Sequence, residues 1–182
     1  MKKIITLFWQ ICLFRAGPEQ VPTASVFTAL AVAVYLITSI TATFFFEPAL
    51  GGNILKAALA VLVGSAVQIS IFAMLLLFKG VMSRFVATLV ALLGTDILLT
   101  VMAMVILGLI SFLGGQATLG ELAIQSTRIF LITLVIWNLA VTGFILHRAT
   151  NTGLFLGNAI AVGSAITAQM IVVAIFLPNL PQ

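Results

Sequence analysis

The sequence predicts an all-α integral membrane protein with five transmembrane helices, preceded by an N-terminal amphipathic helix at the membrane interface. Hydrophobic residues make up 63% of the 182 positions, charged residues make up only 7%, and the mean hydropathy is +1.32. A soluble domain carries about 25% charged residues to keep its surface hydrated. Most of this surface must therefore face lipid, and we expect residues 1–182 to form a single transmembrane domain.

Residues 1–17 are predicted to form the interfacial helix, which the pair Gly17-Pro18 is expected to end. A retained signal anchor is the alternative, but polar residues interrupt the apolar stretch. These polar residues fall within an arc of about 100° on a helical wheel, as in an amphipathic helix. They are Lys2, Lys3, Thr6 and Gln10.

Five apolar runs follow, and each is long enough to cross a bilayer whose core of about 30 Å takes about 20 helical residues. Turn-forming or charged residues bound them, such as Gly51-Gly52-Asn53 before the second run and His147-Arg148 after the fourth. The third run is the longest and is expected to tilt or to extend into the headgroups. The predicted spans are residues 24–46, 54–78, 85–113, 124–146 and 154–177.

The distribution of basic residues predicts the orientation. With five spans, the N-terminal segment and the second-to-third and fourth-to-fifth connections share one side of the membrane. That side carries six basic residues and the other side two, Lys56 and Arg128. Because Lys and Arg collect on cytoplasmic loops, we expect a bacterial inner-membrane protein with a cytoplasmic N-terminus and a periplasmic C-terminus. The six are Lys2, Lys3, Arg15, Lys79, Arg84 and Arg148.

Several classes of function find no support in the sequence. The basic residues are scattered at the ends of apolar runs, which is typical of topology signals and not of nucleic-acid binding. Cys12 is the single cysteine, which excludes an internal disulfide and a multi-cysteine metal site. The chain has no Ser-His-Asp set, no His cluster and no phosphate-binding loop, so we expect no enzymatic activity, no cofactor and no metal.

Polar side chains near the middle of the spans are the candidate functional residues. Asp96 costs about 2.5 to 3.5 kcal/mol to insert if it is ionised, so we expect it to be protonated or paired with amide or hydroxyl groups. Two hypotheses remain: a proton or cation site, and a hydrogen-bonded clasp that specifies helix pairing. The clasp is favoured because Asp96 stands alone and no proline breaks a span. The predicted polar cluster is Gln68, Asp96, Thr100, Asn138 and Gln169.

Small residues recur every four positions in two of the spans and predict close helix packing. In the second span Ala60 and Gly64 lead to Gln68, and a longer ladder in the fifth span leads to Gln169. We expect these two helices to be neighbours, although the longer ladder is also compatible with contact to a partner subunit. The longer ladder consists of Gly153, Gly157, Ala161 and Ala165.

The segment Phe14-Arg15-Ala16-Gly17-Pro18-Glu19-Gln20-Val21-Pro22, placed just before the five apolar runs, resembles the start of small bacterial inner-membrane proteins related to the Yip1 family. The resemblance implies a cytoplasmic N-terminus followed by five membrane helices. Eukaryotic members are associated with vesicle trafficking and small GTPases through a long cytosolic N-terminal region. This chain has only the short segment 1–22 there, so the resemblance implies a fold and no activity.

These observations lead to a functional expectation. The leading hypothesis is a non-catalytic accessory or scaffold subunit of a bacterial inner-membrane complex, which acts by helix packing within the bilayer. Its expected partners are the lipid bilayer and other membrane-protein subunits, or a second copy of the chain. The alternative is a small transporter or proton-conducting protein that uses Asp96.

Overall fold

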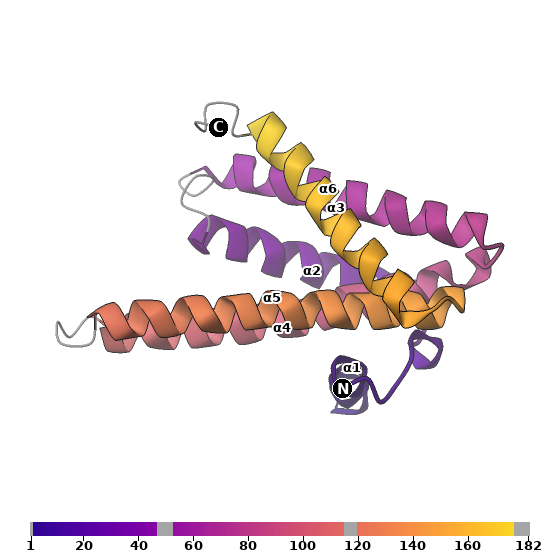
Figure 1. Cartoon of the computed structure of the whole chain (residues 1–182), viewed down its shortest axis with the longest axis horizontal. Coiled ribbons are helices and arrows are strands. Elements are labelled where there is room, and N and C mark those ends of the chain that lie inside the picture. The colour runs from indigo at the N-terminus through magenta and orange to yellow at the C-terminus, as the bar shows by residue number, and fades with distance from the viewer. Residues whose placement is uncertain (1, 47–52, 115–119, 177–182) are drawn as a thin grey trace.

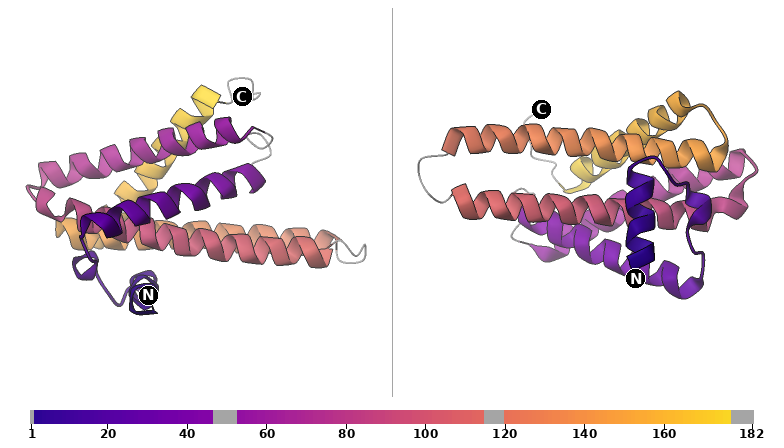
Figure 2. Two further views of the ribbon diagram at one scale, coloured as in Figure 1. Left: turned by 180° about the vertical axis from the view of Figure 1, so that it is seen from behind. Right: turned by 90° about the horizontal axis from the view of Figure 1, so that it is seen from below.

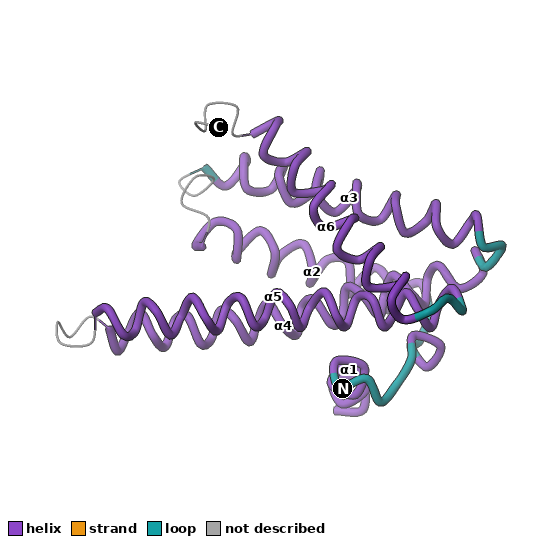
Figure 3. Tube along the Cα trace, viewed as in Figure 1, coloured by secondary structure: helices purple, strands orange, loops and turns teal. Residues whose placement is uncertain are grey.

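The computed structural model describes residues 2–46, 53–114 and 120–176, and this part of the chain consists of helices and the turns that join them (Figure 3). Five of the helices are long and apolar enough to cross a membrane. The predicted all-α class with five long apolar helices is therefore confirmed. In chain order the elements are α1 (Lys2–Cys12), the short 3-10 helix η1 (Pro18–Gln20), α2 (Ser25–Phe46), α3 (Ile54–Phe78), the 3-10 helix η2 (Met82–Arg84), α4 (Phe85–Gly114), α5 (Gly120–Thr150) and α6 (Leu154–Phe176).

Helices α4 and α5 form a long antiparallel pair that divides the molecule (Figures 1 and 2). Helix α1 lies across one face of this pair, whereas α2, α3 and α6 lie on the other side. Helix α6 crosses obliquely, so that it packs against both α5 and α3. Helix α4 is the central element, because it packs against α1, α2, α3 and α5. The candidate site lies on the side of α4 and α5 that faces away from α1.

The N-terminal helix is shorter than predicted. It ends at Cys12 and not at Gly17-Pro18, because Phe14 has a left-handed backbone with φ of 60°. The amide of Arg15 donates to the carbonyl of Gln10 at 2.8 Å, which is the long hydrogen bond of a Schellman cap. The sequence prediction failed here because a bulky residue rarely takes this conformation and no glycine marks the turn.

Aromatic contacts hold the turn after α1 against α5. The Phe14 ring lies with its centroid 5.6 Å from that of Trp137 and 5.3 Å from that of Phe144, the latter edge-on. Such aromatic pairs contribute about 0.5 to 1.5 kcal/mol beyond the area that they bury. These contacts offset the cost of the left-handed backbone at Phe14.

Helix α5 is longer than predicted. It runs from Gly120 to Thr150 and exceeds the predicted span 124–146 by about one turn at each end. The prediction stopped at polar residues, but a helix ends where its backbone changes conformation. At the C-terminal end this happens at Asn151, whose φ is 57° and whose residue type tolerates the left-handed region. The other spans agree within one residue, and position 177 lies outside the described part of the chain.

The segments that follow α3, precede α4 and end α5 meet at one end of the bundle, which we call the basic end and define by Lys79, Arg84 and Arg148. Nη1 of Arg84 donates to the carbonyl of Ala149 at 3.4 Å. Nη1 of Arg148 lies 3.7 Å from Oε1 of Glu19, which ties η1 to α5. An exposed ion pair of this kind contributes about 1 kcal/mol or less, so apolar packing must supply most of the attachment.

That packing depends on Gly94 of α4. A Cβ at this position would overlap the ring of Phe8, so the missing side chain allows α1 to approach α4 closely. Phe8, Ile11 and Cys12 of α1 are buried as a result. Burial also raises the pKa of the Cys12 thiol from 9.0 to about 11, because desolvation disfavours the thiolate.

We expect Gly94→Leu to release α1 and to make Cys12 reactive. The thiolate is the species that reacts with maleimide, and at pH 8 it is scarce in a buried thiol with a pKa of about 11. Release exposes the thiol and returns its pKa toward 9.0, so labelling of Cys12 at pH 8 should become faster by about tenfold or more. Raising the pH through 11 should accelerate labelling of the wild type as well.

Gly108→Leu is the matched control for this experiment. Gly108 lies on the same helix, and a Cβ there meets no atom within 4 Å. Its labelling rate should equal that of the wild type. Slow labelling of the Gly94→Leu variant, at the wild-type rate, would show that α1 does not depend on this close approach.

Candidate functional site

The site begins with a hydrogen bond between the two central helices. Nδ2 of Asn138 on α5 donates to Oδ1 of Asp96 on α4 at 2.7 Å. The hydroxyl of Thr142, one turn further along α5, donates to Oδ1 of Asn138 at 3.3 Å, and this bond orients the amide toward Asp96. Asp96 lies 11 residues into α4, about 17 Å from the helix start. It is thus remote from both helix ends and from the basic end.

A small cavity of about 70 Å³ adjoins the carboxyl of Asp96. Three polar side chains from the opposite helices reach it: Tyr35 from α2 and Ser65 and Gln68 from α3. Tyr35, Ser39 and Ser65 also line one wall of a neighbouring, larger cavity. Asp96 is partly buried and lines the small cavity. The Asp96–Asn138 pair therefore lines one side of this small polar cavity between α2, α3, α4 and α5, which we call the Asp96 chamber.

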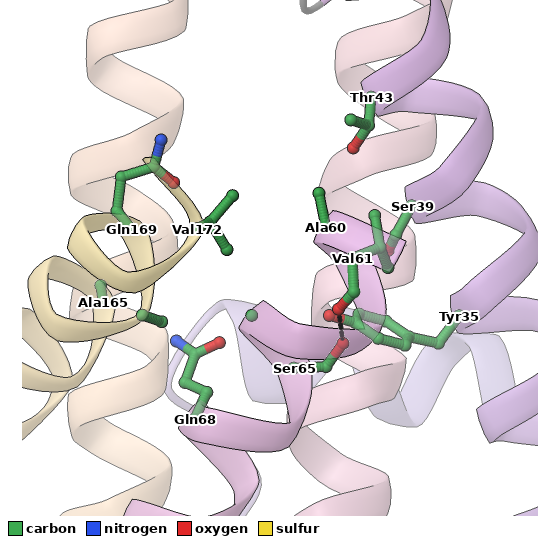
Figure 4. A pocket seen from close by; sticks show the side chains of 12 residues that line it. Tyr35, Ser39, Thr43, Ala60, Val61, Ser65, Gln68, Ala165, Gln169 and Val172 are labelled. Carbon is green, nitrogen blue, oxygen red and sulfur yellow. Dashed lines mark hydrogen bonds between the residues drawn. The ribbon is translucent and has the colours of Figure 1, made fainter. Parts of the chain in front are cut away.

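A larger cavity of about 340 Å³ lies between α2, α3 and α6. Figure 4 shows the amides of Gln68 and Gln169 on its α3 and α6 sides, with Tyr35 and Thr43 along α2. Its walls also contain small residues, Ala60 and Gly64 of α3 together with Ala165 and Ala168 of α6. It is open at its mouth, and it shares Tyr35, Ser65 and Gln68 with the small cavity.

A third cavity, of about 290 Å³, lies beside α4, α5 and α6. It shares Asn138 and Thr142 with the small cavity and Ala165 with the larger one. Gln68 lines all three. This glutamine therefore lies where the three cavities adjoin.

The structure divides the predicted polar cluster. Asp96 and Asn138 meet, and Gln68 lines the same small cavity. Thr100, expected to contact Asp96 from the next turn of the same helix, instead lines the third cavity and has no hydrogen bond to the carboxyl. Gln169 is exposed on the wall of the larger cavity and does not line the Asp96 chamber. The direction of each side chain around its helix, which spacing alone did not predict, separates these two from the pair.

The two small-residue ladders belong to neighbouring helices, as predicted, because α3 and α6 pack against each other. A Cβ on Gly64 would lie 3.3 Å from Val172. The longer ladder changes partner along its length. Gly157 and Ala161 are buried beside α5, and Ala165 lines the larger and the third cavity. Gly153 is exposed, and a Cβ added to it would meet no atom within 4 Å.

Sequence reasoning missed three residues of the chamber: Tyr35, Ser65 and Thr142. Tyr35 stands alone among apolar residues of its helix, and a serine is compatible with any membrane helix, so neither residue type marks a site in the sequence. Ser65 donates to the carbonyl of Val61 in the preceding turn, which is how such residues normally satisfy themselves in helices. Only Thr142 carried a usable signal, since it stands four residues after Asn138 on the same helical face.

In the described part of the chain no three His, Cys, Asp or Glu side chains gather as a metal site would require. Comparisons of the chain with protein-family models, with curated proteins and with solved structures gave no match. The function must therefore be inferred from the geometry of the polar interior.

Proposed function

We propose that the chain is a non-catalytic subunit of a bacterial inner-membrane complex, in which α2 to α6 span the bilayer. Its N-terminus is cytoplasmic and its C-terminus periplasmic, so that the basic end faces the cytoplasm in agreement with the positive-inside rule. Helix α1 then lies at the cytoplasmic interface. The resemblance of residues 14–22 to the Yip1 family supports this layout and adds no activity.

One observation carries the proposal: the cavity of about 340 Å³ is lined by amides that have no hydrogen bond within the described part of the chain. Gln68 and Gln169 stand in helices of high mean hydropathy, which face lipid when they cross a bilayer. An unpaired amide in hydrocarbon costs several kcal/mol. A group placed across the cavity mouth that offers hydrogen bonds would remove this cost.

A transmembrane helix of a partner subunit fits this cavity best. The small residues Ala60, Gly64 and Ala165 allow a helix backbone to approach, and the amides of Gln68 and Gln169 offer donors and acceptors. Small residues with an adjacent amide are the combination by which membrane helices associate, since lipid gives no hydrophobic drive between them. The occupant is therefore a helix that carries a polar side chain near its middle.

Site-specific photo-crosslinking in native membranes tests the proposal. A benzophenone amino acid at Ser39 or Gln169, both on the cavity wall, should give one discrete adduct with a membrane protein. The same probe should give no adduct at Val105, in the C-terminal half of α4, or at Ile132, in the N-terminal half of α5. Both residues are exposed and lie outside the cavity wall. An adduct whose second component is another copy of this chain would show that the partner helix comes from self-assembly.

A cavity-filling variant makes the result specific. Ala165→Leu should abolish the adduct because its side chain occupies the cavity, whereas Val162→Leu, exposed on the same helix, should leave it intact. Labelling of lipid alone from both cavity positions would overturn the proposal.

A further inference from the structure

The charge of Asp96 is not balanced by any protein group around its cavity. Among the residues that the structure describes, no Lys, Arg or His lines the cavity of about 70 Å³, and Tyr35 is the only titratable one besides Asp96. The described polar groups that line the cavity with Asp96 are neutral on each of the three neighbouring helices: Tyr35 from α2, Ser65 and Gln68 from α3, and Asn138 from α5. An ionised carboxylate in the middle of an apolar helix bundle needs one positive charge beside it.

The polar atoms left over around the cavity are mostly oxygens. Asn138 occupies Oδ1 of Asp96, and no described side chain hydrogen-bonds Oδ2. The Ser65 proton is directed at the Val61 carbonyl, so the lone pairs of its hydroxyl oxygen remain available. Tyr35 and Gln68 add a hydroxyl and an amide oxygen. Carboxylate, hydroxyl and amide oxygens are the ligands preferred by hard cations.

The size and charge of the site favour a monovalent over a divalent cation. A volume of about 70 Å³ holds an ion with at most one or two water molecules, since each water takes about 30 Å³. Divalent ions are held by several carboxylates or keep several waters, and this cavity has one carboxylate. The shared wall with the larger cavity, formed by Tyr35, Ser65 and Gln68, provides the approach.

We propose that Asp96, together with Tyr35, Ser65 and Gln68, forms a binding site for a single sodium ion. The ion balances the carboxylate and links α2, α3 and α4, while Asn138 holds the carboxylate in place from α5. Protons compete for the same carboxylate, so the apparent sodium affinity falls as the pH is lowered through the pKa of Asp96. The proposal concerns binding at this chamber and does not depend on a partner helix in the larger cavity.

Thermal unfolding of the purified full-length chain in detergent tests the site. Replacing choline chloride by sodium chloride at constant ionic strength should raise the Tm saturably, by about 3 °C when sodium is in large excess. Asp96→Asn should abolish the rise. Glu19→Gln, which removes a carboxylate at the basic end, should keep it in full. A Tm that depends on pH but is the same in sodium and choline would overturn the proposal, because only protons would then occupy Asp96.

Direct binding keeps the test decisive if Asp96→Asn fails to fold. Equilibrium binding of radioactive sodium to the wild type should saturate at one ion per chain and weaken about tenfold for each pH unit below the pKa of Asp96. Ser65→Ala keeps the carboxylate and should weaken sodium binding several-fold. Absence of saturable sodium binding to the folded wild type would refute the site whatever the outcome at the larger cavity.

Discussion

Gly143→Ala and Gly157→Ala are each expected to lower the free energy of unfolding by about 2 kcal/mol, because they force apart the crossing of α5 and α6. A Cβ on Gly143 would lie 2.7 Å from the Cα of Asn158, and one on Gly157 would overlap the carbonyl oxygen of Gly143. Both obstacles are backbone atoms, so no change of rotamer relieves them. The two helices approach closely only because neither glycine has a side chain.

Gly163→Ala provides the matched control on α6. A Cβ at this position meets no atom within 4 Å. Replacing glycine by alanine inside a helix stabilises it by roughly 0.5 to 1 kcal/mol when nothing obstructs the methyl group. The same chemical change should therefore act in opposite directions at two places on one helix. Unfolding in mixed micelles, followed by tryptophan fluorescence, measures the sign, and equal effects at Gly157 and Gly163 would contradict the observed crossing.

Asn138→Leu is expected to lower the free energy of unfolding by about 2 kcal/mol, because it leaves the carboxyl of Asp96 without its hydrogen-bond partner. The cost comes mainly from the orphaned group and not from the lost bond itself. The double variant Asp96→Leu/Asn138→Leu, which removes both polar groups, should therefore recover part of the loss. A double-mutant cycle should give a coupling energy of about 1 to 1.7 kcal/mol, at the upper end for membrane hydrogen bonds.

Gln169→Leu tests whether this effect belongs to the pair or to any amide in these helices. Gln169 is exposed on the wall of the larger cavity and makes no hydrogen bond within the described residues. Its replacement by an apolar side chain removes no hydrogen bond, so it should not lower the free energy of unfolding of the isolated protein. If the effects of Asp96→Leu and Asn138→Leu on the free energy of unfolding were additive, the hydrogen bond between the two residues would contribute nothing to stability.

The hydrogen bond between Asp96 and Asn138 illustrates how far residue spacing predicts a contact. Asn138 was one of four predicted partners of Asp96, and the spacing on one helix made Thr100 an equally reasonable one. The structure places Asn138 against the carboxyl and Thr100 in a different cavity, because α4 and α5 pack along a particular face. Helix rotation depends on the side chains of both partners and is not contained in the hydropathy of either.

The sequence by itself determined the five long apolar helices, their bounds to within a residue for four of them, and the collection of basic residues at one end. Hydropathy and charge act locally along the chain, and apolar helices satisfy their backbone hydrogen bonds without help from neighbours. Only the tertiary structure decided that α1 packs on Gly94, that the small-residue ladders border an open cavity, and that Gln68 joins three cavities. These features arise where helices cross, and a crossing is set by the fit between two surfaces at the closest approach of their backbones.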